Sequence, residues 1–414
     1  MIKVTLLVVL LLTSCVKSPI VEKDPKPFSP EPEVVEEIVF YDPVETEPTN
    51  TEFKPYFEGQ TRAKGIKTVE SYSVDLIREG LDSPWGIDSL PSGQFIITEK
   101  SGTIRILNQD GNVSDKIFVT DEIDDSGQGG LLDVLVSPDF EIDKTVYFTL
   151  AEKANQGSVT AVAKAQFDLE NTTISQFTII YRALPYFSGN NHYGSRIVMD
   201  DKGNLYVSTG DRQSLSTRGN AQKLDNGHGK ILYIDTDGNA VNTNPFYHND
   251  SAHQAIYSIG HRNIQGLAIH PLTHELWANE MGPQGGDELN LIESGQNYGW
   301  PIISYGEEYS GLPIGEGISV KDGLEQPLYY WDPVIAPAGM IFYESDVIKE
   351  WQNNLFISSL KAQHITRLLI RDNRVIGEER IAENLGQRFR DITEGNDGAL
   401  YTITDSGQVY RIGK

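Results

Sequence analysis

The feature that most constrains the fold is a short unit that recurs six times along the 414-residue chain. Each unit has an apolar run, a turn containing Asp, Pro or Gly, and a strand-like run of aromatic or aliphatic residues, followed by a further strand. Almost no segment has the periodicity of an amphipathic helix. The apolar runs that open the units are Trp85-Gly86-Ile87, Leu131-Leu132, Ile197-Val198-Met199, Leu267-Ala268-Ile269, Met340-Ile341-Phe342 and a run at Ile392.

Units of roughly 45 to 75 residues with four strands each are typical of β-propeller blades. We therefore predict that residues 68–414 form an all-β domain, a six-bladed β-propeller of four-stranded antiparallel blades. Residues 72–77 belong to no unit. We expect them to complete the last blade beside residues 409–412 and so to close the ring. A β-sandwich or an uneven barrel is the alternative.

Residues 1–14 have the pattern of a bacterial lipoprotein signal peptide. Lys3 gives a positive start, and the apolar run of residues 4–12 is too short to span a bilayer as a mature helix. The ending Leu12-Thr13-Ser14-Cys15 resembles a lipobox, which implies a lipidated Cys15 and a lipid-anchored protein of the periplasm or outer membrane. An ordinary secretory signal is the alternative. Cys15 is the only cysteine, which excludes an intrachain disulfide and a covalently attached c-type haem.

Residues 15–67 combine the lipidated cysteine with a linker rich in Pro and Glu. The segment has no sustained hydrophobic periodicity, so we predict a disordered, extended tether that holds the propeller away from a membrane. The alternative is that the segment wraps on the domain surface.

The charge of the chain limits its partners. It has 59 acidic and 34 basic side chains, a formal net charge of −25. Such a surface repels nucleic acid and anionic lipid headgroups, so we expect no nucleic-acid partner and membrane contact through the lipid alone. A basic cluster in this acidic domain predicts a specific anionic target.

Polar side chains recur just before the first strand of several units. Gln128, His192, Arg262 and Arg388 all hold this position, in four different units. In a propeller, the loops that lead into the innermost strands open at one end of the central channel. We therefore predict a polar, partly cationic pit on the axis.

Nine motifs follow one another in order along residues 75–414: GQGGLLDV (127–134), NHYGSR (191–196), STGDR (208–212), GHRNIQG (260–266), EMGPQGGDELN (280–290), NYGWP (297–301), APAGM (336–340), LKA (360–362) and RFRD (388–391). Together they resemble the soluble, pyrroloquinoline quinone (PQQ)-dependent aldose sugar dehydrogenase family, also called the glucose/sorbosone dehydrogenase family. The resemblance implies a calcium-dependent quinoprotein that oxidises an aldose at C1 to a lactone. With no haem site in the chain, its electrons would pass to an external acceptor.

The resemblance implies three catalytic residues, His192, Asp211 and Arg262. An imidazole, with an unperturbed pKa near 6.5, suits removal of a hydroxyl proton at neutral pH. Asp211 matches the carboxylate that orients this base. A lone histidine before a strand is more often a structural hydrogen-bonding residue, and the nearby Asp211 favours the catalytic interpretation.

The cofactor residues implied by the resemblance are polar or cationic. Guanidinium groups bind carboxylates in a bidentate manner, which suits a cofactor with three carboxylates. Any one of the arginines could instead be an ion-pair partner at the surface or between blades. The implied set is Gln128, Arg262, Asn263, Gln265, Lys361, Arg388 and Arg390.

Two calcium positions are implied by the same resemblance. Gly282 and Pro283 match a turn whose backbone carbonyls bind calcium beside the cofactor, and calcium prefers such oxygen ligands. Asp287, Glu288 and Tyr298 match a second, structural position, although two acids beside an Asn could also be a solvated turn.

Two residues depart from the family pattern, and two other functions stay open. Asn191 stands where some relatives have an acid, and Ala338 lacks a hydroxyl that many have, at a cost of about 1 kcal/mol in one hydrogen bond. A non-catalytic propeller that binds glycans or protein is the first alternative. A metal-dependent hydrolase or lactonase is the second, but it needs carboxylates around the axis.

Overall fold

The computed structural model describes residues 38–414. The predictions for the signal peptide, for lipidation at Cys15 and for the first part of the tether lie outside the described residues. Within the described part of the chain, no helix combines the length and the apolar character that a bilayer crossing needs.

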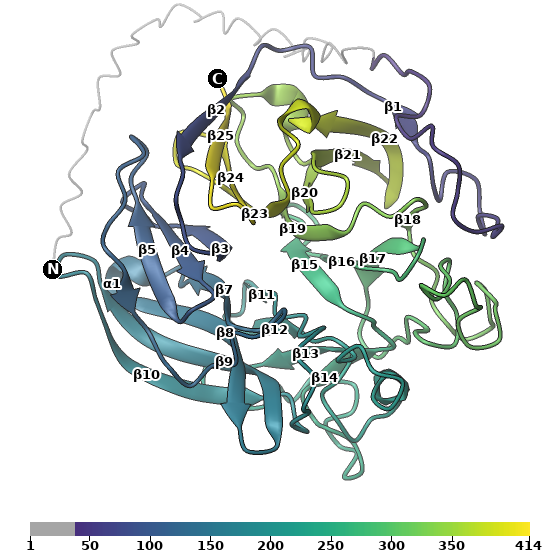
Figure 1. The fold of residues 1–414 in the computed structure, drawn as a ribbon, viewed down its shortest axis with the longest axis horizontal. Coiled ribbons are helices and arrows are strands. Elements are labelled where there is room, and N and C mark those ends of the chain that lie inside the picture. Colours follow the sequence, from purple (N-terminus) through teal and green to yellow (C-terminus); the bar gives the residue numbers. More distant parts are fainter. Residues whose placement is uncertain (1–37) are drawn as a thin grey trace, which may run out of the picture. The chain divides into compact units, whose positions relative to one another are not determined.

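Six sheets are arranged around a central axis, which confirms the predicted six-bladed propeller (Figure 1). Each blade is antiparallel, and its strands run in order from the innermost strand outward. The first three blades are β3 (Pro84–Ser89), β4 (Phe95–Glu99), β5 (Thr103–Leu107) and β6 (Ile117–Phe118); β7 (Leu131–Val136), β8 (Thr145–Ala154), β9 (Gly157–Asp168) and β10 (Thr173–Arg182); and β11 (Ile197–Met199), β12 (Leu205–Ser208), β13 (Lys230–Ile234) and β14 (Ile256–Ile259).

The last three blades follow the same pattern. They are β15 (Ile264–Ile269), β16 (Leu276–Glu280), β17 (Asp287–Ile292) and β18 (Tyr329–Trp331); β19 (Pro337–Phe342), β20 (Leu355–Ser359), β21 (Ile365–Arg371) and β22 (Arg374–Ile381); and β23 (Phe389–Glu394), β24 (Leu400–Thr404), β25 (Val409–Gly413) and β2 (Ser73–Arg78). The helical pieces are short: α1 (Phe140–Asp143) and the 3-10 turns Arg218–Gln222, Lys349–Trp351 and Glu383–Leu385.

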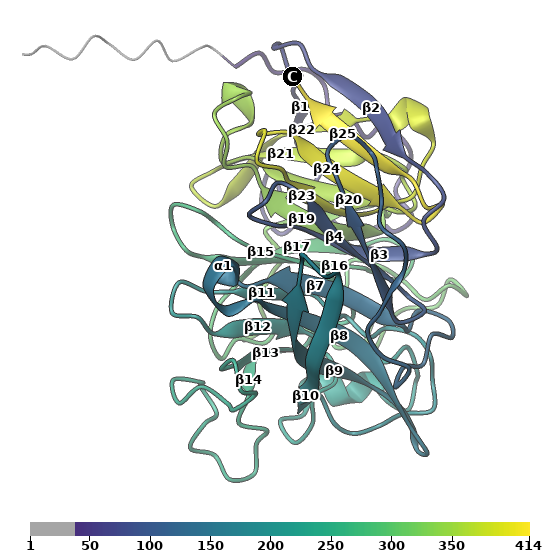
Figure 2. The same cartoon turned by 90° about the vertical axis from the view of Figure 1, so that its left-hand side faces the viewer.

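The ring is closed by the strand that precedes the first complete blade. β2 pairs antiparallel with β25, with Ser73 opposite Gly413 and Val74 opposite Ile412, and the two strands lie side by side in both views (Figures 1 and 2). The predicted closure is therefore confirmed. It joins the two ends of the propeller sequence in one sheet, so that the last blade depends on both.

The prediction of an extended tether through residue 67 is wrong for residues 39–67. This segment packs on the propeller: β1 (Lys64–Gly65) pairs in parallel with β22, and Gln60 is fully buried, with its side-chain N–H donated to Pro327 O at 2.8 Å. The segment has no periodicity of its own because its buried contacts are made with an existing sheet edge. Covering an edge strand also protects it from pairing with other chains.

The core lies between the blades. Every residue of β4, β16, β20 and β24 is buried, because each sheet is covered by a neighbouring blade on both faces. Strands buried on both faces lose the alternation of polar and apolar residues. This explains why the sequence shows continuous apolar runs. Polar side chains gather instead in the loops before the innermost strands.

Candidate active site

β-Bulges turn side chains of the innermost strands toward the axis. Five of the six innermost strands have a register shift at their start, and β11 is the exception. Between Pro84 and Ile87, for example, β3 advances three residues while β4 advances two, from Glu99 to Ile97. A bulge of this kind redirects the local side chains. Four bulge residues line a cavity on the axis: Trp85, Leu132, Gln265 and Arg390.

This central cavity has a volume of about 210 Å³. Five residues implied by the sequence line it: Gln128, Asn263, Gln265, Arg388 and Arg390. Its other polar or aromatic lining side chains were not singled out from the sequence as site residues, and they include Trp85, Lys100 and Tyr193. Lys361 is exposed and is not among the lining residues, although the neighbouring Leu360 is.

The lining has an excess of positive charge. Lys100, Arg388 and Arg390 contribute three cations, and no lining residue is acidic. Behind the cavity, Asp405 accepts hydrogen bonds from Nε of Arg388 and from Nε of Arg390, each at 2.8 Å. One carboxylate is thus shared by two guanidinium groups. Such a site suits an anionic ligand.

His192 and Asp211 form a buried pair beside this cavity. Nδ1 of His192 lies 2.7 Å from Oδ1 of Asp211, and the histidine is 4% exposed. The backbone of His192 has a φ of 48°, a left-handed conformation that residues other than glycine rarely adopt. Gln128 holds this conformation, because its Oε1 accepts the His192 backbone N–H at 2.8 Å.

The protonation state of the pair follows from its surroundings. Burial and the positive charge of Arg262 lower the pKa of His192, and these outweigh the opposing effect of Asp211. Although burial opposes it, the hydrogen bond with His192 holds the pKa of Asp211 below its usual value. An ionised carboxylate only accepts, so Nδ1 of neutral His192 donates and Nε2 keeps the free lone pair. Within residues 38–414, nothing hydrogen-bonds to Nε2.

Trp300 connects this pair to Arg262. Its indole N–H donates to Oδ2 of Asp211 at 2.8 Å, and the guanidinium carbon of Arg262 lies 5.2 Å from the indole centroid. Nη1 of Arg262 donates to the carbonyls of Met281 and Gly282, each at 2.8 Å. The three implied catalytic residues are therefore contiguous. Arg262 does not line the central cavity but a smaller cavity next to Trp300.

This smaller cavity, of about 10 Å³, lies beside the implied calcium ligands. It is lined by Gly282, Pro283, Glu288, Tyr298 and also Glu280. A volume of this size fits one water molecule or ion. Burial and the negative charge of Glu280 raise the pKa of Glu288, and no cation pairs with Glu288 in the described part of the chain. Glu280 accepts a hydrogen bond from the Arg262 backbone N–H at 2.6 Å and lies 2.9 Å from Nδ1 of His261. The negative charge of the two buried carboxylates around one small space fits a cation.

The other implied calcium residues are already bound to protein groups. The carboxylate of Asp287 accepts the backbone N–H groups of Gly282 and Ala336, each at 2.7 Å, and burial raises its pKa to about 7. The hydroxyl of Tyr298 donates to Leu291 O at 2.6 Å. Among residues 38–414, no three His, Cys, Asp or Glu side chains form a group suited to a metal. A cation in this space would need backbone carbonyls among its ligands.

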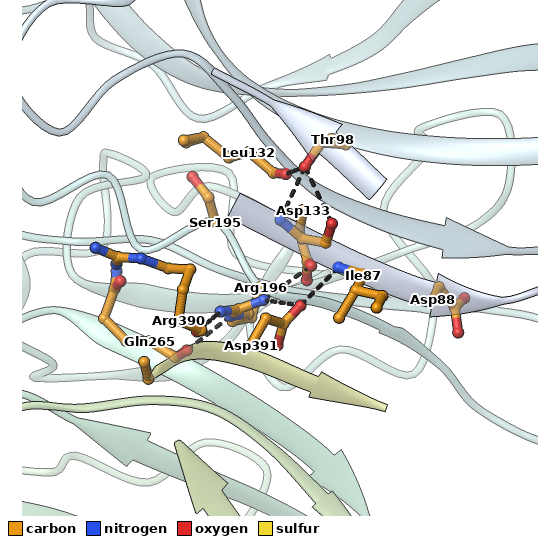
Figure 3. A network of polar contacts seen from close by, with 12 residues as sticks. Ile87, Asp88, Thr98, Leu132, Asp133, Ser195, Arg196, Gln265, Arg390 and Asp391 are labelled. Carbon is orange, nitrogen blue, oxygen red and sulfur yellow. Dashed lines mark hydrogen bonds and ion pairs between the residues drawn. The ribbon is translucent and has the colours of Figure 1, made fainter. Parts of the chain in front are cut away.

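Arg196 separates the central cavity from a second cavity of about 260 Å³ farther along the innermost strands. Its Nη1 lies 2.9 Å from Asp133 and 2.9 Å from Asp391. Figure 3 draws both ion pairs as dashed lines. Its Nε and Nη2 donate to the carbonyls of Gln265 and Arg390. The guanidinium thus joins its own blade to three others across the axis.

The position of Arg196 between the two cavities depends on residues in the bulges of neighbouring blades. Asp391 accepts the N–H of Ile87 at 2.9 Å, and a Cβ added to Gly339 would lie 1.7 Å from the Asp391 carboxylate. Only glycine leaves room for that carboxylate. Arg196 ends the NHYGSR motif, but the sequence indicated no role for it, since its partners come from distant blades.

The two departures from the family pattern have simple structural settings. Ala338 lies in the bulge of β19, is fully buried, and accepts a hydrogen bond from Asn279 through its carbonyl at 2.8 Å. The carbonyl of Asn191 accepts a bond from Nε of Arg212 at 3.0 Å. Both residues are held through their backbone carbonyls.

Comparison with known proteins agrees with this geometry. The family model "Glucose / Sorbosone dehydrogenase" matches residues 81–411. The aldose sugar dehydrogenase YliI of Escherichia coli K12 is 36% identical, over 82% of this chain and 92% of the relative. Quinoprotein glucose dehydrogenase B of Acinetobacter calcoaceticus is 26% identical, over 81% of this chain and 86% of the relative.

Solved structures share the fold. The apo-form of the soluble aldose sugar dehydrogenase of E. coli has a TM-score of 0.78 and 34% identity, over 83% of this chain and 99% of that one. The PQQ-bound aldose sugar dehydrogenase of Streptomyces coelicolor has a TM-score of 0.68 and 25% identity, over 83% and 98%. The chain therefore belongs to the glucose/sorbosone dehydrogenase family, a family of oxidoreductases that act on sugars.

Proposed function

We propose that this protein is a PQQ- and calcium-dependent aldose dehydrogenase that oxidises C1 of the sugar to give a lactone. The main support is the position of a neutral, oriented imidazole, His192, beside a cavity with three cationic side chains and no acidic lining residue. A propeller that only binds glycans or protein has no need of such a base.

The residues of the central cavity fit a planar tricarboxylate. Arg388 and Arg390 would bind cofactor carboxylates, and the side-chain amides of Gln128, Asn263 and Gln265 would donate to its ring and quinone oxygens. When bound, the quinone accepts the hydride that leaves C1 of the sugar. Pocket residues that are already held in place by the blades lose little entropy on binding.

His192 acts as the general base in this proposal. Its Nε2 takes the proton of the C1 hydroxyl as the hydride leaves C1. Asp211 stabilises the resulting imidazolium and keeps the ring in the correct tautomer. Arg262 lies close enough to affect the pKa of both residues, and its charge would stabilise negative charge that develops on a nearby oxygen.

Calcium would be held by oxygen ligands around the small cavity. Glu280 and Glu288 supply the charge, and the carbonyls of Gly282 and Pro283 lie on the same loop. The Gly282 carbonyl already accepts a bond from Arg262, so a cation there would share its second lone pair. Glu280 was not singled out from the sequence and would add to the implied set of Asp287, Glu288 and Tyr298.

We also propose a cellular location and partners for the protein. The pattern around Cys15 supports a lipid anchor in the bacterial cell envelope. The electrons would leave to a separate acceptor molecule, and the substrate is an aldose.

Reconstitution tests the proposed function. Purified protein with PQQ, CaCl₂ and an aldose should reduce a redox dye, and omission of either PQQ or calcium should remove most of the rate. The control replaces calcium with magnesium, which demands a smaller and more regular site. Dye reduction without PQQ, or none over a wide panel of aldoses with both additions, would contradict the proposal.

A second test concerns the hydrogen bond between Trp300 and Asp211. Trp300→Phe keeps an aromatic ring near Arg262 but removes the indole donor, so Asp211 and His192 lose part of their alignment. We expect kcat to fall by about 10-fold, with little change in PQQ affinity. Trp277→Phe is the matched control, because Trp277 is buried and its indole N–H has no partner among the described residues. Equal kcat in the two variants would rule out a role for the bond.

A further inference from the structure

We infer that Lys100 is a further cofactor-binding residue, which pairs with a carboxylate of the bound quinone. The inference rests on the proposed function. It concerns one side chain that neither the motifs nor the family resemblance pointed to.

The backbone of Lys100 is fixed at the wall of the central cavity. The residue follows β4 directly, and its N–H donates to Ser83 O at 3.2 Å. Its carbonyl accepts the N–H of Leu131, the first residue of β7, at 3.0 Å. Lys100 is thus held between the first two blades. Lys361, by contrast, is exposed and lies outside the cavity lining.

The ammonium group of Lys100 has bonding capacity to spare. Nζ donates to the carbonyl of Gly127 at 2.7 Å. Of the three N–H donors of an ammonium group, one is used in this bond. Gly127 adjoins Gln128, whose side chain accepts the backbone N–H of His192. Lys100 therefore stands next to the loop whose Gln128 holds the backbone of the proposed base.

The charges around Lys100 favour an anion. Burial and the positive charge of Arg390 lower the pKa of Lys100, and Asp124, Asp125 and Asp405 offset this only in part. The protein groups around Lys100 therefore disfavour its charged form. A ligand carboxylate between Lys100 and Arg390 would offset this effect, since each cation gains an anionic partner.

The test is PQQ affinity, measured by equilibrium dialysis of the calcium-loaded protein. Lys100→Met keeps the length of the side chain and removes its charge. We expect the Kd for PQQ to rise by about 10-fold or more, while Lys100→Arg keeps most of the affinity. Lys202→Met, a change at an exposed turn lysine, should alter the Kd by less than about 3-fold. Melting curves of the apo-proteins show whether each variant is folded.

The outcomes separate this inference from the proposed function. If the wild-type protein binds PQQ and Lys100→Met binds it equally well, the inference is wrong and the function stands. If the wild-type protein does not bind PQQ, the proposed function and the inference fail together. A loss confined to Lys100→Met, restored by Lys100→Arg, supports both.

Discussion

His192→Ala should lower kcat by about 10²- to 10⁴-fold, the usual contribution of a general base. The affinity for PQQ should change little, because His192 is not among the residues that line the central cavity. Asp211→Asn should also lower kcat strongly. An amide in place of the carboxylate can donate to Nδ1, which would move the imidazole proton to Nε2 and remove the free lone pair. Stopped-flow reduction of the bound quinone by an aldose measures this step directly.

The turnover rate should fall at acid pH, where His192 becomes protonated. The base is active only when neutral, and burial together with Arg262 lowers the pKa of His192 below its ordinary value. The wild-type rate should therefore stay high as the pH falls to 6.5, the ordinary pKa of histidine, and decrease only at lower pH. His192→Ala should lose this acid limb, and His248→Ala, at an exposed histidine, should retain it. Full turnover in His192→Ala would rule out the proposed base.

Arg196→Met should destabilise the fold by about 3–5 kcal/mol, the usual cost of breaking a buried ion pair. The substitution leaves Asp133 and Asp391 buried without their shared cation. Burial already raises the pKa of Asp133 to about 7 and raises the pKa of Asp391, and Arg196 opposes both shifts. Without Arg196, both carboxyls should bind protons more strongly in the folded state. Urea unfolding at pH 5 and pH 8 measures the effect.

The sign of this effect follows from linkage. A carboxyl whose pKa is raised on folding stabilises the folded state least at high pH, where it must lose its proton. The loss in Arg196→Met should therefore be larger at pH 8 than at pH 5. Adding Asp133→Asn and Asp391→Asn should restore part of the stability. Lys164→Met is the control, because Lys164 pairs at 3.5 Å with Asp237, whose side chain is 77% exposed, and such surface pairs contribute little. An unchanged urea midpoint for Arg196→Met would show that the ion pairs of Arg196 do not stabilise the fold.

Much of the site could be predicted because the residues that form it recur at one position of a repeated unit. Gln128, His192 and Arg388 precede innermost strands, and the axis of a propeller brings such positions together. Asp211 could be associated with His192 through the family resemblance, and the structure places the two residues at the two ends of the hairpin formed by β11 and β12. The fold itself followed from local patterns, since each unit is a meander of adjacent strands.

Other features depend on contacts between blades. The pairing of Arg196 with Asp133 and Asp391 joins residues up to 195 positions apart, and no local pattern records it. The bulges that turn Trp85 and Gln265 toward the axis arise from the register between paired strands. Lys100 and Lys361 are both lysines next to a strand end, and only the tertiary structure shows which one lines the cavity.

The N-terminal segment illustrates the same division. Its composition indicated a chain that builds no core of its own, and residues 39–67 contain only the two-residue strand β1. They are ordered by the edge of β22 and by pockets such as the one that holds Gln60. The amino-acid sequence by itself determined the six-bladed propeller and its closure, and the family resemblance of its motifs pointed to His192 as the proposed base. The tertiary structure alone decided the register, the partners of the buried charges and the cations of the cavity, because these depend on distances between segments that are remote in the chain.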